Sequence, residues 1–78
     1  MRLVDLIGFL NGRVRIFLNR VVVLDFFMYD DADIVFESGN RDTLDYLCWT
    51  QYAYVDSVFA IGRKIIGVNI SLDEKRED

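Results

Sequence analysis

The stretch VVVLDFFMY, residues Val21–Tyr29, contains three valines, a leucine, three aromatic residues and a methionine, with one carboxylate, Asp25. β-Branched and aromatic side chains favour strands, and a run this apolar is typical of a strand that is covered on both faces. The stretch therefore predicts the central strand of a β-sheet. The other elements are placed relative to it.

The chain before this strand predicts a helix and a strand. Apolar residues at helical spacing predict a short helix over residues 3–10, with a stripe made of Leu3, Leu6, Ile7 and Leu10. Residues 13–18 alternate between apolar and basic or aromatic side chains, as expected for a strand with one core face. Asn19-Arg20 predicts a two-residue turn, so this strand should pair antiparallel with Val21–Tyr29.

The chain after this strand predicts a turn, a helix and a second hairpin. Residues 30–33 predict the turn, and residues 34–37 are compatible with a short third strand. A helix is expected over residues 42–50, with Asn40 as its cap and with three residues facing inward, Leu44, Leu47 and Cys48. Alternating residues before and after Gly62-Arg63, over residues 52–61 and 64–72, predict a hairpin whose core residues include Ile66, Val68 and Ile70.

These elements add up to one α+β domain over residues 1–72. The order is helix, hairpin, short strand, helix, hairpin. We expect a small, twisted, mostly antiparallel sheet of four or five strands, with both short helices on one face. Residues 73–78 are all charged and are expected to be a disordered tail.

The apolar content is high for the length. Of the 78 residues, 53% are hydrophobic and 14% are aromatic. A chain this short has a large surface for its volume, so part of this apolar surface should remain exposed. The composition therefore predicts a homodimer, packed sheet against sheet, or another protein that covers the exposed part.

The charges are distributed unevenly along the chain. The net charge is −4, with no histidine. Residues 1–20 hold four arginines against one aspartate, whereas residues 21–60 hold eight carboxylates against one arginine. Such an acidic segment repels nucleic acid and anionic lipid and favours a basic protein surface. We expect no direct nucleic-acid binding and no membrane binding.

The sequence offers little for catalysis. Cys48 is the only cysteine, so the chain forms no internal disulfide and no cysteine-based metal site, and Cys48 is expected to be a small core residue. No phosphate-binding loop, zinc spacing or nucleophile motif occurs. We therefore expect no enzyme, no cofactor and no metal. The N-terminal segment does not resemble a signal peptide and no uncharged run is long enough to span a membrane, so a cytoplasmic protein is expected.

Carboxylates and exposed aromatic residues are the candidate partner-binding groups. Tyrosine and tryptophan are enriched at interface hot spots, and here they lie close in sequence to acidic residues, although the core could take up half of these aromatic side chains. The acidic residues around 30–33 lack the spacing of a calcium loop, so an exposed turn is favoured over a metal site. The predicted partner-binding residues are Asp30, Asp31, Asp33, Asp42, Asp45, Tyr46, Trp49, Tyr52 and Tyr54.

A second cluster, Arg13, Arg15, Phe17 and Arg20, is open to two interpretations. Basic and aromatic residues on one strand can bind single-stranded nucleic acid. Alternatively, the arginines pair across strands with Asp25 or Asp56. The net negative charge favours the second interpretation.

Several short segments resemble small accessory proteins of Gram-positive phages and mobile elements, among them anti-CRISPR proteins. The similarity spans most of the chain and is carried, in order, by Val14-Arg15-Ile16, Val23-Leu24-Asp25, Leu44-Asp45-Tyr46-Leu47, Val55-Asp56-Ser57-Val58 and Ile66-Gly67-Val68-Asn69-Ile70. The first turn has Arg20 where such proteins usually have glycine. The resemblance implies a small, acidic, non-catalytic protein that occupies the surface of a host protein.

The sequence thus favours a protein–protein interaction module. Its expected role is that of an accessory or inhibitor protein that binds a basic surface of a host protein, such as a nucleic-acid-handling enzyme. The alternative is a structural or assembly subunit whose exposed apolar face is its own oligomer interface.

Overall fold

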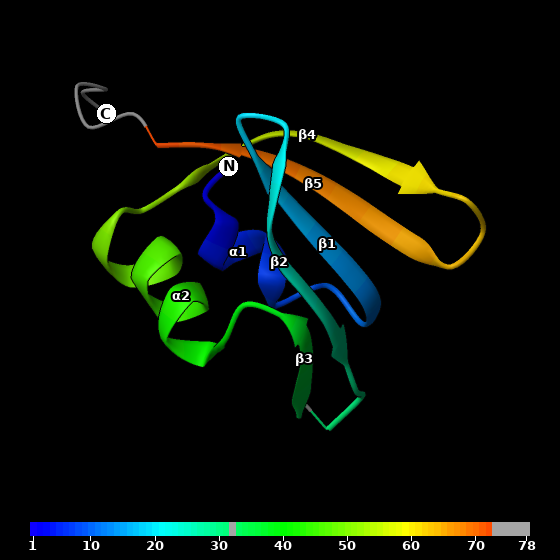
Figure 1. The fold of residues 1–78 in the computed structure, drawn as a ribbon. Helices are drawn as coiled ribbons and strands as arrows, with labels where there is room; N and C mark the ends of the chain where they lie inside the picture. The colour runs from blue at the N-terminus through cyan, green and yellow to red at the C-terminus, as the bar shows by residue number, and fades with distance from the viewer. Residues whose placement is uncertain (32, 73–78) are drawn as a thin grey trace.

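The computed structural model describes residues 1–31 and 33–72, which form one mixed five-stranded sheet with short helices (Figure 1). The predicted α+β class and the short third strand are confirmed. The predicted tail, residues 73–78, lies outside the described residues. In chain order the elements are α1 (Leu3–Ile7), β1 (Gly12–Leu18), β2 (Val21–Met28), β3 (Ile34–Ser38), α2 (Arg41–Asp45), the π-helix η1 (Tyr46–Thr50), β4 (Tyr54–Ile61) and β5 (Ile65–Ser71).

The strand order in the sheet is β3-β2-β1-β5-β4. Both predicted hairpins are present, because β1 pairs antiparallel with β2 and β4 pairs antiparallel with β5. The two hairpins are joined by a parallel pairing of β1 with β5. The prediction that Val21–Tyr29 is the central strand was therefore wrong, since β1 occupies the centre.

The prediction that β2 is covered on both faces was also wrong. Leu24 and Phe26 are fully buried beneath the helices, but Phe27, on the opposite face, is 39% exposed. At the hairpin end, Val21 is 61% exposed. The run is apolar along its whole length because the face that the helices leave open also carries apolar side chains.

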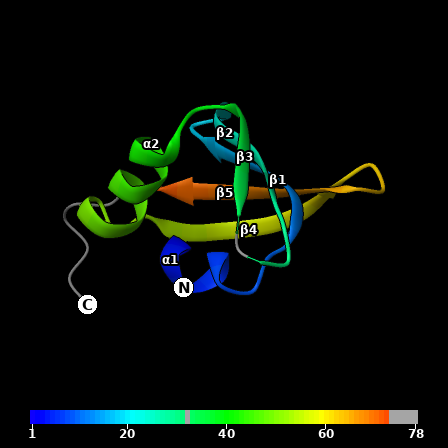
Figure 2. The ribbon, with the colours of Figure 1, turned by 90° about the horizontal axis from the view of Figure 1, so that it is seen from below.

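The core lies between the sheet and the helices, on one face of the sheet (Figures 1 and 2). The three residues of α2 and η1 that were expected to face inward are buried. Helix α1 ends at Ile7, earlier than predicted, and only Leu3 of its stripe is fully buried. The buried apolar residues are Leu3, Val14, Ile16, Leu24, Phe26, Met28, Leu44, Leu47, Cys48, Ala53, Val68 and Ile70.

Two tight connections use left-handed backbone. Asn19 and Arg20 have φ of 52° and 67°, which is the pattern of a two-residue hairpin turn, so the predicted turn is confirmed without a glycine. Gly39, between β3 and α2, has φ of 84°. A Cβ there would lie 2.5 Å from a Leu24 methyl carbon and 2.8 Å from the Val23 carbonyl oxygen. Only glycine allows the chain to pass this close to β2 before α2 begins.

A substitution of Val68 tests the assignment of the core. Val68 has no exposed surface, whereas Val35, on the edge strand β3, is 51% exposed. Val68→Asp buries an unpaired charge and should lower the free energy of unfolding by at least about 3 kcal/mol. In so small a domain, this is enough to leave most molecules unfolded. Val35→Asp is the matched control and should change the free energy of unfolding by less than about 1 kcal/mol. Equal melting temperatures for the two variants would contradict this core.

Candidate functional site

One exposed helical surface combines carboxylates with aromatic rings. Asp42, Asp45, Tyr46 and Trp49 follow one another at offsets of three, four and seven residues from the first, so the helical repeat places them on the same outward face. All four are exposed, with Tyr46 at 50% and Trp49 at 61%. We call these four residues the helical patch. It unites four of the predicted binding residues.

Local interactions hold this surface in place. The Asn40 side chain accepts a hydrogen bond from the Thr43 backbone N–H at 2.8 Å, which caps α2 as predicted. The helix then widens into η1, where the Gln51 N–H donates to the Tyr46 carbonyl at 2.9 Å. The Gln51 side chain also donates to the Tyr46 hydroxyl oxygen at 2.6 Å. Tyr46 is therefore held at both its backbone and its ring. Short π-helical segments are often found at functional sites.

Tyr52 and Tyr54 follow the helical patch and contact the N-terminal segment. The Arg2 guanidinium lies 5.3 Å from the ring centroid of Tyr52 and 4.5 Å from that of Tyr54. Arg2 Nη1 also donates to the Tyr52 carbonyl oxygen at 2.7 Å. Tyr52 has φ of 50°, which is unfavourable for a bulky residue and is supported by these contacts. The two tyrosines thus have a structural role, although Tyr52 remains 48% exposed.

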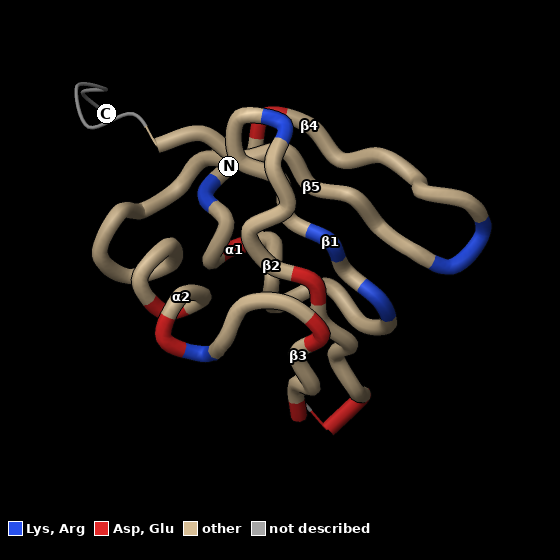
Figure 3. The backbone as a smooth tube through the Cα atoms, viewed as in Figure 1, with Lys and Arg blue, Asp and Glu red and all other residues tan. Residues whose placement is uncertain are grey.

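The three remaining predicted residues, Asp30, Asp31 and Asp33, lie elsewhere, between β2 and β3. We call them the acidic turn. Asp31 accepts a hydrogen bond from the Asp33 N–H at 3.2 Å, and Asp30 accepts one from the Asn11 side chain at 3.1 Å. All three are exposed. Figure 3 shows them apart from the carboxylates of α2. The acidic segment of the sequence is therefore divided between two places on the surface.

An open groove of about 480 Å³ lies between the acidic turn and the start of α2. The groove is lined by two charged residues, Asp30 and Arg41, and Arg41 is the first residue of α2. Its apolar lining consists of Ile7, Phe9, Leu10, Met28, Tyr29 and Ile34. Phe9 is 85% exposed and was not predicted as a binding residue. The sequence contained a signal, because Phe9 falls outside the apolar stripe of the first helix.

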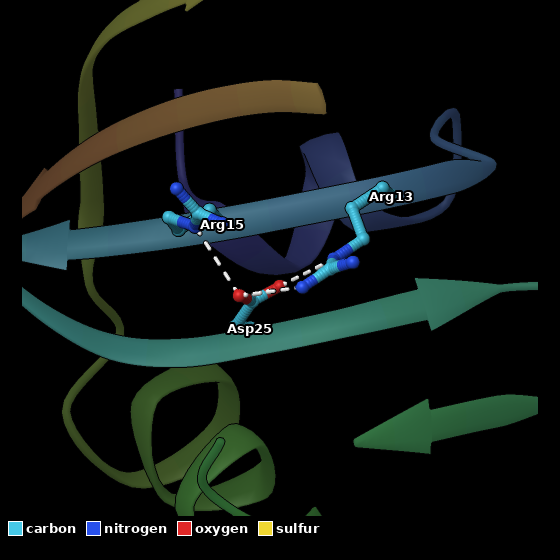
Figure 4. Close-up of polar contacts among 3 residues, drawn as sticks. All are labelled: Arg13, Arg15 and Asp25. Carbon is cyan, nitrogen blue, oxygen red and sulfur yellow. Dashed lines mark hydrogen bonds and ion pairs between the residues drawn. The ribbon is translucent and has the colours of Figure 1, made fainter. Parts of the chain in front are cut away.

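The open face of the sheet carries an ion cluster made of Arg13, Arg15 and Asp25 (Figure 4). Arg13 Nε lies 2.8 Å from Asp25 Oδ1, Arg13 Nη2 lies 3.0 Å from Oδ2, and Arg15 Nε lies 3.2 Å from Oδ2. The predicted pairing of these arginines with Asp25 is confirmed. The hydrogen bond from Arg13 lowers the pKa of Asp25, and burial opposes this effect. Asp25 is therefore an ionised partner for two arginines at neutral pH.

Apolar rings flank the ion cluster on the open face. Phe17 and Phe59 have ring centroids 5.7 Å apart on one side, and Phe27 and Tyr29 have centroids 4.7 Å apart on the other. Phe59 covers Gly67, since a Cβ on that glycine would lie 2.5 Å from its ring. The open face therefore has an ion-paired centre, in which two arginines share one carboxylate, between two aromatic pairs.

Cys48 is buried, as predicted for a core residue. Burial, together with the nearby charge of Asp45, raises the pKa of the thiol to about 11. Among the described residues, no group of three or more histidine, cysteine or acidic side chains is arranged to hold a metal ion.

No protein-family model, curated protein or solved structure matches the chain. In the described part of the chain, no helix combines the length and the hydropathy that crossing a membrane requires.

The ion cluster predicts a specific pH dependence. The pKa of Asp25 in the folded protein is below the ordinary value of 3.8, so its stabilising effect is complete above pH 3.8 and is lost as the pH falls through the folded value. Asp25→Asn should cost about 1–3 kcal/mol at neutral pH, measured by urea denaturation. The difference from wild type should shrink below pH 3.8. Asp30→Asn, at an exposed position, should change stability by less than about 0.5 kcal/mol and serves as control. A wild-type advantage unchanged in acid would contradict the assignment.

The state of Cys48 can be tested with a thiol reagent. A buried, protonated thiol reacts poorly because the thiolate is the nucleophile. Labelling of the folded protein at neutral pH should be far slower than labelling in denaturant. Equal rates in the two conditions would show that Cys48 is accessible.

Proposed function

We propose that this protein is a non-enzymatic binding module that uses the helical patch to occupy a basic surface of another protein. The observation that carries the proposal is Trp49, a large aromatic side chain that is 61% exposed beside Asp45 and Tyr46. Exposing a tryptophan ring to water is unfavourable, and aromatic residues of this kind dominate the binding energy of many interfaces.

The charges of the patch specify the class of partner. Asp42 and Asp45 are exposed and no basic residue lies between them and Trp49 in sequence. Together with the net charge of −4, they favour a partner surface rich in lysine and arginine. Long-range attraction between such surfaces accelerates association. Nucleic-acid-handling enzymes have basic surfaces of this kind, which agrees with the expected role as an anti-CRISPR-like inhibitor or accessory protein of a phage or mobile element.

The groove beside the acidic turn supports the same proposal. Its rim carries Asp30, and the exposed Phe9 and Tyr29 provide apolar contact area. The groove also reaches Arg41, which precedes the first carboxylate of the helical patch. A partner that binds the patch can thus extend towards the acidic turn. In this arrangement the patch supplies most of the binding energy and the acidic turn adds attraction at longer range.

A second candidate function is that of an assembly subunit. The exposed outer edge of β4 favours it, because an open strand edge can pair with another strand. The two functions use different surfaces and can coexist in one protein.

The proposal is tested by affinity capture from the presumed host, followed by binding kinetics with the captured protein. Trp49→Ala should weaken binding by at least about 2 kcal/mol, roughly a 30-fold change, mainly through faster dissociation. Asp42→Asn/Asp45→Asn should slow association and reduce its dependence on salt. Asp30→Asn/Asp31→Asn/Asp33→Asn should also slow association, but less.

Each variant is first compared with wild type in thermal unfolding, because exposed side chains contribute little to stability. Phe27→Ala, an exposed aromatic change on the open face, is the control for non-specific loss of apolar surface. Binding that survives Trp49→Ala unchanged, or that is insensitive to salt and to the carboxylates, would refute the proposal.

A further inference from the structure

The two edges of the sheet differ in how well they are protected. Strand β3 is short and carries Glu37, and both features discourage pairing with a further strand. Strand β4 extends over Tyr54–Ile61 and is the other edge. Within the described residues, the N-terminal segment bonds to β4 only near its start, where the Val55 N–H donates to the Met1 carbonyl at 2.8 Å. The edge from Asp56 to Ile61 has no strand beside it there.

This open edge is apolar and projects from the domain. The residues from Ser57 to Ile61 include no charge. Val58 is 51% exposed, Phe59 is 38% exposed and Ala60 is also exposed. Figures 1 and 2 show the β4–β5 hairpin extending beyond the helices, where another chain can approach it. A long, uncharged, exposed edge strand is a ready template for pairing with a further strand.

The charges at the two ends of this edge identify its partner. Asp56 lies at one end, and Arg63 and Lys64 lie in the turn at the other end. Two copies of β4 placed antiparallel bring the acidic end of each copy beside the basic end of the other. A parallel arrangement would place like charges together. The edge is therefore complementary to itself in the antiparallel direction, as a twofold interface requires.

We propose that two copies of this chain associate through β4, antiparallel about a twofold axis close to Phe59, so that both sheets become one continuous sheet. In this register Phe59 of one copy lies opposite Phe59 of the other. Phe59 is already fixed by its contacts with Phe17 and Gly67, so little side-chain entropy is lost when the copies meet. Asp56, which accepts a hydrogen bond from the Ser71 hydroxyl at 3.1 Å, lies next to the partner's basic turn. The interface differs from the sheet-against-sheet dimer expected from composition.

The first test is the oligomeric state of the full chain, measured by sedimentation at micromolar concentration. Wild type should be a dimer. Val58→Lys should be monomeric, because it places two lysines close to the twofold axis and edge lysines block strand pairing. Val35→Lys is the matched control, because Val35 is also a valine with 51% exposure, on the opposite edge strand β3. It should remain dimeric.

The second test uses charge reversal to establish the antiparallel pairing. Asp56→Lys should weaken the dimer, and so should Arg63→Glu/Lys64→Glu, since each variant places like charges together at both ends. An equimolar mixture of the two variants should form heterodimers, because each acidic group again meets a basic group. Circular dichroism confirms that each variant is folded.

A monomeric wild type would overturn the proposal. It would also be overturned by a dimer that both Val58→Lys and Asp56→Lys leave intact, since the copies would then associate through another surface. Failure of the mixture to restore dimers would exclude the antiparallel register. None of these outcomes depends on the helical patch.

Discussion

The hydrogen-bonded ion cluster of Arg13, Arg15 and Asp25 is the interaction on which the sheet depends. A central strand has neighbours on both sides, and β1 carries two arginines on one face. Asp25, on the neighbouring strand, is only 7% exposed and accepts hydrogen bonds from both. This pairing offsets one of the two positive charges on the open face of β1, the strand that joins the two hairpins through its parallel pairing with β5. Without Asp25, two like charges would lie side by side on the central strand.

Local sequence features predicted the helices, strands and turns well. They predicted less well which strands pair when those strands are far apart in the sequence. The Asn19-Arg20 turn, the cap at Asn40 and the second hairpin were predictable because each depends on residues close in sequence. The strand order was not. An apolar run indicates how much of a strand is suited to burial, but it does not indicate which strands lie beside it, so β2 was wrongly placed at the centre. The charge pairing of Arg13 with Asp25 was predictable, but it indicates only that β1 lies beside β2 and not which of the two strands is central.

The candidate site could be predicted only in part, for a similar reason. Asp42, Asp45, Tyr46 and Trp49 are close in sequence and share one helical face, so the sequence was sufficient to bring them together. The acidic turn belongs to a different part of the surface, and the groove beside it is formed by the end of α1 with the segment that follows it, the end of β2, the start of β3 and the start of α2. Distances between such elements depend on the strand order, which the sequence did not reveal. The structure thus has three separate surfaces of interest: the helical patch, the groove with its acidic rim, and the β4 edge. We propose the first two as the binding surface for a basic partner protein and the third as the contact with a second copy of the chain.

The central claim is that the helical patch is the surface that meets the partner protein. Amide hydrogen exchange measured with and without the captured partner tests it most directly, because exchange slows where an interface orders and covers the backbone. The account predicts that protection increases across α2 and η1, residues 41–50, and to a smaller extent around the acidic turn, while β4 is unaffected at a constant oligomeric state. Unchanged exchange over residues 41–50, with new protection confined to the open face or to β4, would contradict it.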